Sequence, residues 1–163
     1  MDPEKYKAKK NEPEIYSPKE DKLISLKQKG GIEDLLERGS WYNVDSRINS
    51  DNFSGKDEKI EGLEFSVLRF REMIDAESVL ADMELQGLEP GTLEELLLVE
   101  VQAPDFERQW PVVALGSVFH DKERDIDLVP VAYYTENGRG IRLTNKDSAF
   151  GDEYRFLAIK LKK

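Results

Sequence analysis

The second half of the chain is dominated by patterns of apolar and polar residues that are typical of β-strands. Five runs have such a pattern: 63–70, 112–119, 129–135, 141–144 and 154–161. Residues 63–70 alternate in hydrophobicity, whereas 112–119 are continuously apolar, as in a buried strand. Residues 154–161 place apolar side chains on both faces, which predicts a central strand. Asn137-Gly138, between the third and fourth runs, is typical of a tight hairpin turn.

Two helices are predicted between the first two of these strands. Asp75 is a good N-cap for a helix that extends to Gln86, and Gly87 is suited to end it. Thr92 and Glu95 have the spacing of a capping box, which opens a second, shorter helix. Short hairpin connections favour antiparallel pairing of the strands. We therefore expect an α+β fold, with a mainly antiparallel sheet and two helices packed on one side of it.

Lys, Glu, Asp and Pro dominate the beginning of the chain, where few apolar residues are available for burial. Such a stretch does not offset the entropy lost on ordering, so residues 1–31 are expected to form a charged, disordered arm. The alternative is an extended segment that lies along the domain through Ile15 and Tyr16. Residues 32–62 are expected to form a short helix and a linker, and residues 63–163 a single α+β domain.

Two features stand out within the predicted linker. Residues 32–38 have the apolar spacing of a short helix, and Gly39 is suited to an αL cap. The pair Trp41-Tyr42 lies in an otherwise polar loop. We interpret this pair as a hydrophobic anchor, and a platform for a ligand is the alternative.

The chain has a formal net charge of −10, and its acidic residues are unevenly distributed. Nucleic-acid binding by the folded domain is not expected, because affinity for phosphates depends on clustered Lys and Arg. Residues 72–107 contain eleven acidic residues and no Lys or Arg. Both predicted helices lie in this segment, and five of its acidic residues are expected to be exposed: Glu84, Glu89, Glu94, Glu95 and Glu100. Such a surface either aids solubility or binds a basic partner.

The composition excludes several classes of site. Without Cys and with a single His, the chain has no disulfide, no thiolate metal site and no multi-histidine metal site. No apolar run has the length that a membrane span requires, and the N-terminus does not resemble a signal peptide. A cytoplasmic location is therefore the default expectation, and neither a cofactor nor contact with a membrane is expected.

The segment from His120 to Asp127 carries the candidate chemistry of the chain. Asp121, Asp125 and Asp127 could bind a hard cation through carboxylate oxygens, although the glycine and the distal Glu of an EF-hand are missing. The alternative is a solvated loop. Ser117 lies near His120 but lacks the motif and the third group of an activated serine, so nucleophilic catalysis is not expected.

Three segments resemble a family of uncharacterised bacterial proteins: Gly87–Leu96, Trp110–Ser117 and Tyr154–Ala158. More remotely, residues 89–94 and 154–157 are similar to the helix start and the closing strand of C-type-lectin-like domains of the formylglycine-generating-enzyme type. The resemblance implies a C-type-lectin-like fold. The catalytic cysteines of those enzymes and the motifs of calcium-dependent sugar binding are missing here, so the resemblance implies neither activity.

These observations favour a non-enzymatic binding module whose ligand is a protein or another macromolecule. In lectin-like folds the binding surface is built from loops, which here are 119–128, 135–140 and 144–153. The candidate binding residues near these loops are Tyr133, Tyr134, Arg139 and Arg142. Two alternatives stay open: an acidic decoy or inhibitor that binds a basic partner through residues 72–107, and a carboxylate- or metal-dependent enzyme.

Overall fold

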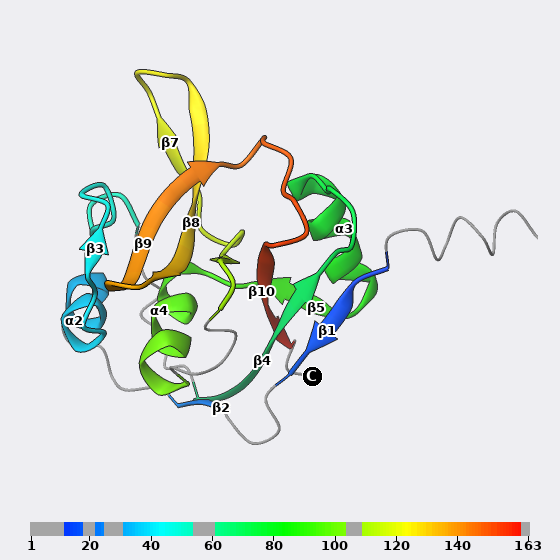
Figure 1. Cartoon of the computed structure of the whole chain (residues 1–163), viewed down its shortest axis with the longest axis horizontal. Helices are drawn as coiled ribbons and strands as arrows, with labels where there is room; N and C mark the ends of the chain where they lie inside the picture. The colour runs from blue at the N-terminus through cyan, green and yellow to red at the C-terminus, as the bar shows by residue number, and fades with distance from the viewer. Residues whose placement is uncertain (1–11, 18–21, 25–30, 54–60, 104–108, 161–163) are drawn as a thin grey trace, which may run out of the picture.

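The computed structural model describes residues 12–17, 22–24, 31–53, 61–103 and 109–160, with the backbone alone for 22–24 and 61–63 (Figure 1). The helices are α2 (Gly31–Arg38), α3 (Ala76–Leu85) and α4 (Leu93–Gln102). The strands are β1 (Glu14–Tyr16), β2 (Lys22–Ile24), β3 (Asn43–Val44), β4 (Glu61–Arg69), β5 (Leu88–Pro90), β6 (Val112–Val113), β7 (Phe119–Asp121), β8 (Ile126–Thr135), β9 (Gly138–Asn145) and β10 (Arg155–Lys160). The α+β class predicted from the sequence is confirmed.

The strands form a sheet with the order β1-β4-β10-β6-β8-β9-β3, and β2, β5 and β7 pair with β4, β10 and β8. β10 runs parallel to β6, and β3 runs parallel to β9. The other pairs among the described strands are antiparallel. β10 lies at the centre because β4, β5 and β6 all pair with it. Its residues 155–159 are buried, as the apolar pattern on both faces predicted.

The two sides of the sheet carry separate hydrophobic clusters. Leu157 and Ile159 of β10 belong to the α4-side core, which includes buried residues of α2 and α4. Phe156 and Ala158 belong to the α3-side core. Because alternate residues of a strand point to opposite faces, α3 and α4 cover opposite sides of the sheet. The prediction that both helices pack on one side of the sheet was wrong. Between α3 and α4 the chain passes through the sheet as β5, which pairs with β10, so the chain enters the sheet from the α3 side and continues on the α4 side.

Both predicted helix starts are confirmed. The Asp75 side chain accepts a hydrogen bond from Ser78 N, at 2.8 Å, at the start of α3. At the start of α4, Thr92 Oγ1 accepts from Glu95 N while the Glu95 carboxylate accepts from Thr92 N. These bonds satisfy backbone donors that a helix N-terminus otherwise leaves without partners.

Residues 32–53, the described first part of the predicted helix and linker 32–62, contribute to the α4-side core. Their buried apolar side chains are Ile32, Leu35, Ile48 and Phe53. Gly39 is not the αL cap, because the positive φ, of 51°, belongs to Ser40. Gly39 instead leaves room for Trp41, since a Cβ there would lie 2.2 Å from Trp41 Nε1. Trp41 packs partly buried against the core, as predicted for an anchor, whereas Tyr42 is 62% exposed.

The predicted strand over 112–119 is interrupted by a turn between β6 and β7. This turn packs closely on the start of α4. Gly116 N donates to the carbonyl of Gly91, and Ser117 Oγ accepts from Leu93 N at 2.8 Å. The continuous apolar run therefore reflects a short strand followed by a tightly packed turn. The Ser117 hydroxyl accepts a hydrogen bond at the N-terminus of α4.

β8 and β9 form a long hairpin, as Asn137-Gly138 predicted. The turn residues are Glu136 and Asn137, because Thr135 pairs with Gly138. The turn therefore lies one residue earlier than expected. Gly138 has a φ of 128°, a backbone region that favours glycine.

Part of the predicted N-terminal arm pairs with the sheet. β1 lies antiparallel to β4 with Ile15 opposite Leu68, which is the alternative arrangement considered for the arm. β2 continues along the same strand. Residues 1–11, 18–21 and 25–30 lie outside the described residues, so the predicted disorder is not tested there.

Candidate functional site

The β7–β8 hairpin projects from the rest of the molecule and carries the acidic residues considered as metal ligands (Figure 1). His120 lies between two of them, with Nδ1 2.8 Å from Asp127 Oδ1 and Nε2 3.2 Å from Asp125 Oδ1. The hydrogen bond to Asp127 raises the pKa of His120 above its ordinary value. Asp121 instead accepts N–H groups of its own turn and lies 3.9 Å from Arg47. The described part of the chain contains no group of three or more possible metal ligands, so the Asp121, Asp125 and Asp127 carboxylates do not converge on a metal site.

The acidic residues of the two helices lie in different environments. Glu84 of α3 is exposed on the α3 side. Glu89 of β5 is also exposed, but it pairs with Ile159 and so points to the α4 side of the sheet. Glu94 is only 7% exposed and Glu95 belongs to the capping box, so the prediction that both are exposed on α4 was wrong. Glu100 is also largely buried, with its side chain 12% exposed. Burial follows from the position of α4, which packs into the core on more than one side.

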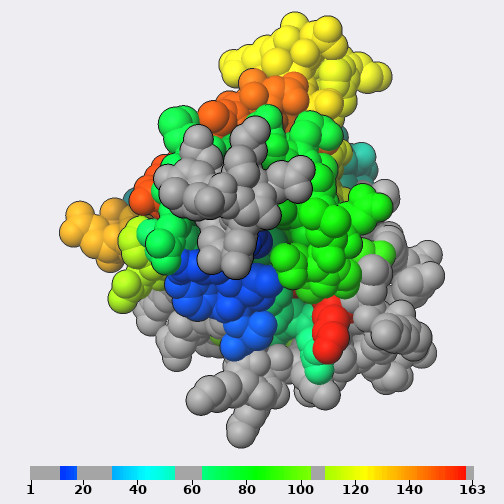
Figure 2. Space-filling view, turned by 90° about the vertical axis from the view of Figure 1, so that its right-hand side faces the viewer, coloured from blue at the N-terminus to red at the C-terminus, as the bar shows by residue number. Residues whose placement is uncertain are grey.

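Most of the exposed acidic residues of 72–103 lie on and beside α3, in the part of the molecule that Figure 2 shows beside β1 and below the projecting hairpin. Its exposed acidic residues are Glu72, Asp75, Glu77 and Glu84. Two large apolar side chains are exposed in the same part of the chain, Met73 at 68% and Leu85 at 82%. This surface combines negative charge with apolar contact area.

The four predicted binding residues of the β8–β9 hairpin are divided between its two faces. Tyr134 and Arg139 are cross-strand neighbours on the face toward α4. Arg139 Nη1 donates to the main-chain carbonyl of Glu100 and lies 3.4 Å from its Oε2. The guanidinium also lies 5.7 Å from the ring centroid of Trp41. Burial raises the pKa of Glu100 above its ordinary value, and the charge of Arg139 opposes that shift.

Tyr133 and Arg142 point to the opposite face of the same hairpin. Arg142 Cζ lies 5.8 Å from the centroid of the Tyr133 ring, and Arg142 Nη2 donates to Tyr154 Oη at 3.2 Å. Asn43 Nδ2 donates to Tyr133 Oη at 3.1 Å. We call Asn43, Tyr133, Arg142 and Tyr154 the tyrosine–arginine face. Among the residues that the structure describes, Arg142 has no acidic partner.

The backbone around Tyr133 explains how its ring is held. A Cβ on Gly140 would lie 2.2 Å from Tyr133 Cζ, so the ring occupies the space that the missing side chain leaves. The parallel pairing of β3 with β9 places Asn43 opposite Gly140, next to this ring. Tyr154 is held from the other direction by Phe150, a buried residue whose ring centroid is 5.2 Å away in a T-shaped contact. The face therefore joins the α3-side core to the edge strand β3.

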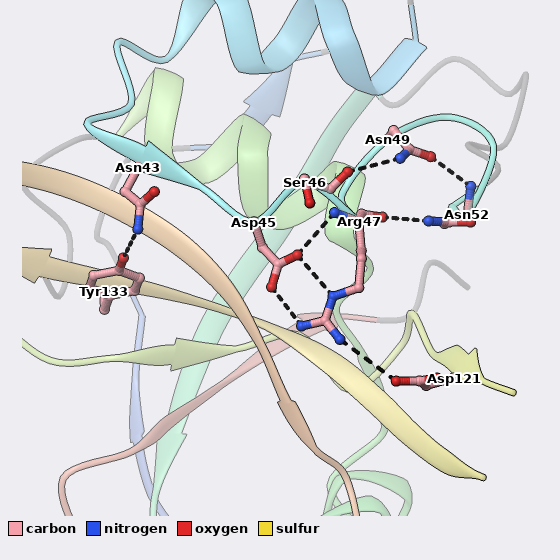
Figure 3. A network of polar contacts seen from close by, with 8 residues as sticks. All are labelled: Asn43, Asp45, Ser46, Arg47, Asn49, Asn52, Asp121 and Tyr133. Carbon is pink, nitrogen blue, oxygen red and sulfur yellow. Dashed lines mark hydrogen bonds and ion pairs between the residues drawn. The ribbon is translucent and has the colours of Figure 1, made fainter. Parts of the chain in front are cut away.

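The loop that follows β3 is stiffened by its own side chains (Figure 3). Arg47 forms a bidentate pair with Asp45, at 3.0 and 2.7 Å. Hydrogen bonds from Arg47 hold the pKa of Asp45 below its ordinary value. Asn52 donates to the Arg47 carbonyl, and Asn49 donates to the Ser46 carbonyl. These contacts, with the backbone bond from Asp45 N to Ile141, fix β3 beside β9 and so fix Asn43.

The sequence analysis identified Tyr133 and Arg142 but missed Asn43 and Tyr154. Tyr154 is the first residue of the predicted strand 154–161 and directly precedes β10 in the structure, so its contact with the hairpin depends on how distant strands pair. Asn43 lies in a two-residue strand that no periodicity reveals. The three loops expected to form one surface are also separated. The register pairs Leu128 with Asn145 at one end of the hairpin and Thr135 with Gly138 at the other, so 135–140 begins far from 119–128 and 144–153.

The chain matches no protein-family model, no curated protein and no solved structure. None of the described helices combines the length and apolar character needed to cross a bilayer. The geometry of the surface is therefore the basis on which a function is proposed.

Proposed function

We propose that the protein is a non-enzymatic binding module that binds a partner protein through the tyrosine–arginine face. The observation that carries this proposal is Arg142. In a chain of net charge −10, this partly buried guanidinium contacts two tyrosines and has no acidic partner among the described residues. Arginine and tyrosine are enriched where protein interfaces derive most of their binding energy. As part of the same proposal, the fold is C-type-lectin-like and its sheet is mainly antiparallel.

The construction of the face supports binding more than packing. Asn43, Tyr133 and Arg142 belong to neither hydrophobic core, although they lie on a sheet that is otherwise covered by helices. Their orientation is nevertheless defined by Gly140, by β3 and by Tyr154. A rigid, partly exposed group of aromatic and cationic side chains loses little entropy on binding.

The proposal is tested by affinity capture with the full chain as bait. Wild-type protein is compared with Arg142→Gln and with Arg38→Gln, a matched loss of one charge on α2, where Arg38 forms a surface pair with Asp34. We expect a protein that wild type and Arg38→Gln retain and that Arg142→Gln loses. If every protein retained by wild type is retained equally by Arg142→Gln, the proposal fails.

A second candidate function uses the acidic α3 surface. The exposed Met73 and Leu85 favour it, because a basic and apolar segment of a partner would match both the charge and the contact area of this surface. Charge reversal at Glu77 and Glu84, both exposed on α3, should then abolish binding of a basic partner, and high salt should weaken it. Binding that survives both changes would exclude this candidate.

A further inference from the structure

The hydrogen bonds of the tyrosine–arginine face run in directions that leave donors available. Tyr133 Oη accepts from Asn43, and Tyr154 Oη accepts from Arg142. Each phenol therefore still has its own O–H to donate, because a tyrosine hydroxyl both donates and accepts. The Arg142 guanidinium carries several further N–H donors, and its single hydrogen bond within the described residues goes to Tyr154. The face is thus rich in donors and suited to an acceptor.

The positive charge of Arg142 favours an acceptor group that is negatively charged. Several other arginines are paired within the chain, for example Arg47 with Asp45 and Arg139 with Glu100. Just after β9, Lys146 Nζ lies 4.0 Å from Glu77 Oε1. Arg142 has no such carboxylate among the described residues, so a group that supplies one from outside would form a charge-assisted hydrogen bond of the kind arginine makes best.

We infer that the face binds one carboxylate, the side chain of an Asp or Glu on the partner protein. This inference rests on the proposed function and names the group that the face recognises. Arg142 supplies the cationic fork, and the hydroxyls of Tyr133 and Tyr154 supply neutral donors beside it. The cation–π contact with the Tyr133 ring and the bond to Tyr154 hold the guanidinium in place before the ligand arrives.

A carboxylate fits this surface better than a phosphate group. The chain carries a net charge of −10, so a ligand with about two negative charges is repelled more strongly than one with a single charge. One unpaired arginine also matches one carboxylate in charge. A neutral amide offers an acceptor oxygen but lacks the charge that makes the hydrogen bond strong.

The test uses small probes and the full chain, observed by NMR. Acetyl-glutamate amide is the probe, acetyl-glutamine amide is its neutral match, and inorganic phosphate is the third ligand. We expect the glutamate probe to give a saturable shift of the Arg142 Nε–H signal and of the backbone amides of residues 140–144. The glutamine probe should give no saturable shift, and phosphate a weaker one than glutamate.

Variants separate the role of Arg142 from a general effect of charge. Arg142→Gln should abolish the response, and Arg38→Gln should leave it unchanged. Replacing Tyr133 and Tyr154 together by Phe keeps both rings and should weaken the glutamate probe by roughly tenfold, as expected for lost hydrogen bonds to a charged group. The unperturbed remainder of each spectrum reports that the variant is folded.

Three results would overturn the inference: no saturable shift with the glutamate probe, an equal shift with the glutamine probe, or tighter binding of phosphate. If capture of a partner depends on Arg142 while the glutamate probe has no effect, the carboxylate assignment alone fails. If capture does not depend on Arg142 either, the proposed function fails as well.

Discussion

The β8–β9 hairpin carries a tyrosine and an arginine on each of its two faces, and the two pairs have different environments. Arg139 is covered by the end of α4, where it neutralises the buried Glu100 and lies against Trp41. Arg142 lies on the other face of the hairpin, where its described contacts are two tyrosines. The same residue type therefore pairs with a carboxylate on one face and with tyrosines on the other. The two environments differ because the end of α4 and Trp41 pack over the face that carries Arg139.

Replacing Arg139 should have the largest effect on stability. Arg139→Gln leaves the Glu100 carboxylate buried without its partner, and breaking such a pair costs about 3 kcal/mol at neutral pH. Arg142→Gln removes no ion pair among the described residues and should cost less than about 1 kcal/mol. Chemical denaturation of the two variants and of Arg38→Gln measures the loss of unfolding free energy in each. Equal losses for Arg139→Gln and Arg142→Gln would contradict this prediction.

The loss in Arg139→Gln should also depend on pH. Burial already raises the pKa of Glu100, and removing the opposing charge of Arg139 raises it further. A carboxyl whose folded pKa lies above its unfolded pKa binds more protons in the folded state, so stability increases as pH falls through that range. The difference between wild type and Arg139→Gln should therefore shrink from neutral pH toward the ordinary pKa of Glu. A difference that is constant with pH would show that Glu100 is not responsible.

Gly140→Ala tests how the exposed face is built. The added methyl group would meet the Tyr133 ring, which must move, and overpacking of this kind costs about 1–3 kcal/mol. In a Tyr133→Ala background the same change should cost much less, because the ring is gone. Denaturation of the two single variants and the double variant gives the coupling. Additive losses would show that the ring and Gly140 do not meet.

The smallest expected effect concerns the bond between Arg142 and Tyr154. Tyr154→Phe removes the acceptor of Arg142 Nη2 and should cost about 1 kcal/mol or less. In an Arg142→Gln background the cost should fall, since the bond is already lost. A Tyr154→Phe cost that is the same in both backgrounds would mean that the two side chains do not interact in solution.

Local features of the fold were predictable from the sequence. Asp75, Thr92 and Glu95 mark helix starts because capping involves residues only a few positions apart. The β8–β9 hairpin and the buried strand β10 were predictable from a turn dipeptide and an apolar pattern. The break in 112–119 was not, because it depends on the contact of Gly116 with the start of α4.

The candidate site was predictable only in part. Alternation along a strand already requires Tyr133 and Tyr134 to point to opposite faces, so grouping them on one surface was an error that the sequence could have prevented. The exposure expected for Glu94 assumed that the polar positions of α4 face solvent, whereas α4 packs into the core on more than one side and buries Glu94.

By itself the sequence determined the caps, the hairpin and the alternation of side chains along each strand, because these depend on neighbours along the chain. Only the tertiary structure decided that Glu100 meets Arg139, and that Asn43 and Tyr154 meet the Tyr133–Arg142 pair. Those contacts join residues separated by up to 90 positions, through strands that are not consecutive. Long-range pairing of strands carries no local signal, and it is what leaves one arginine paired with an acid and the other with tyrosines.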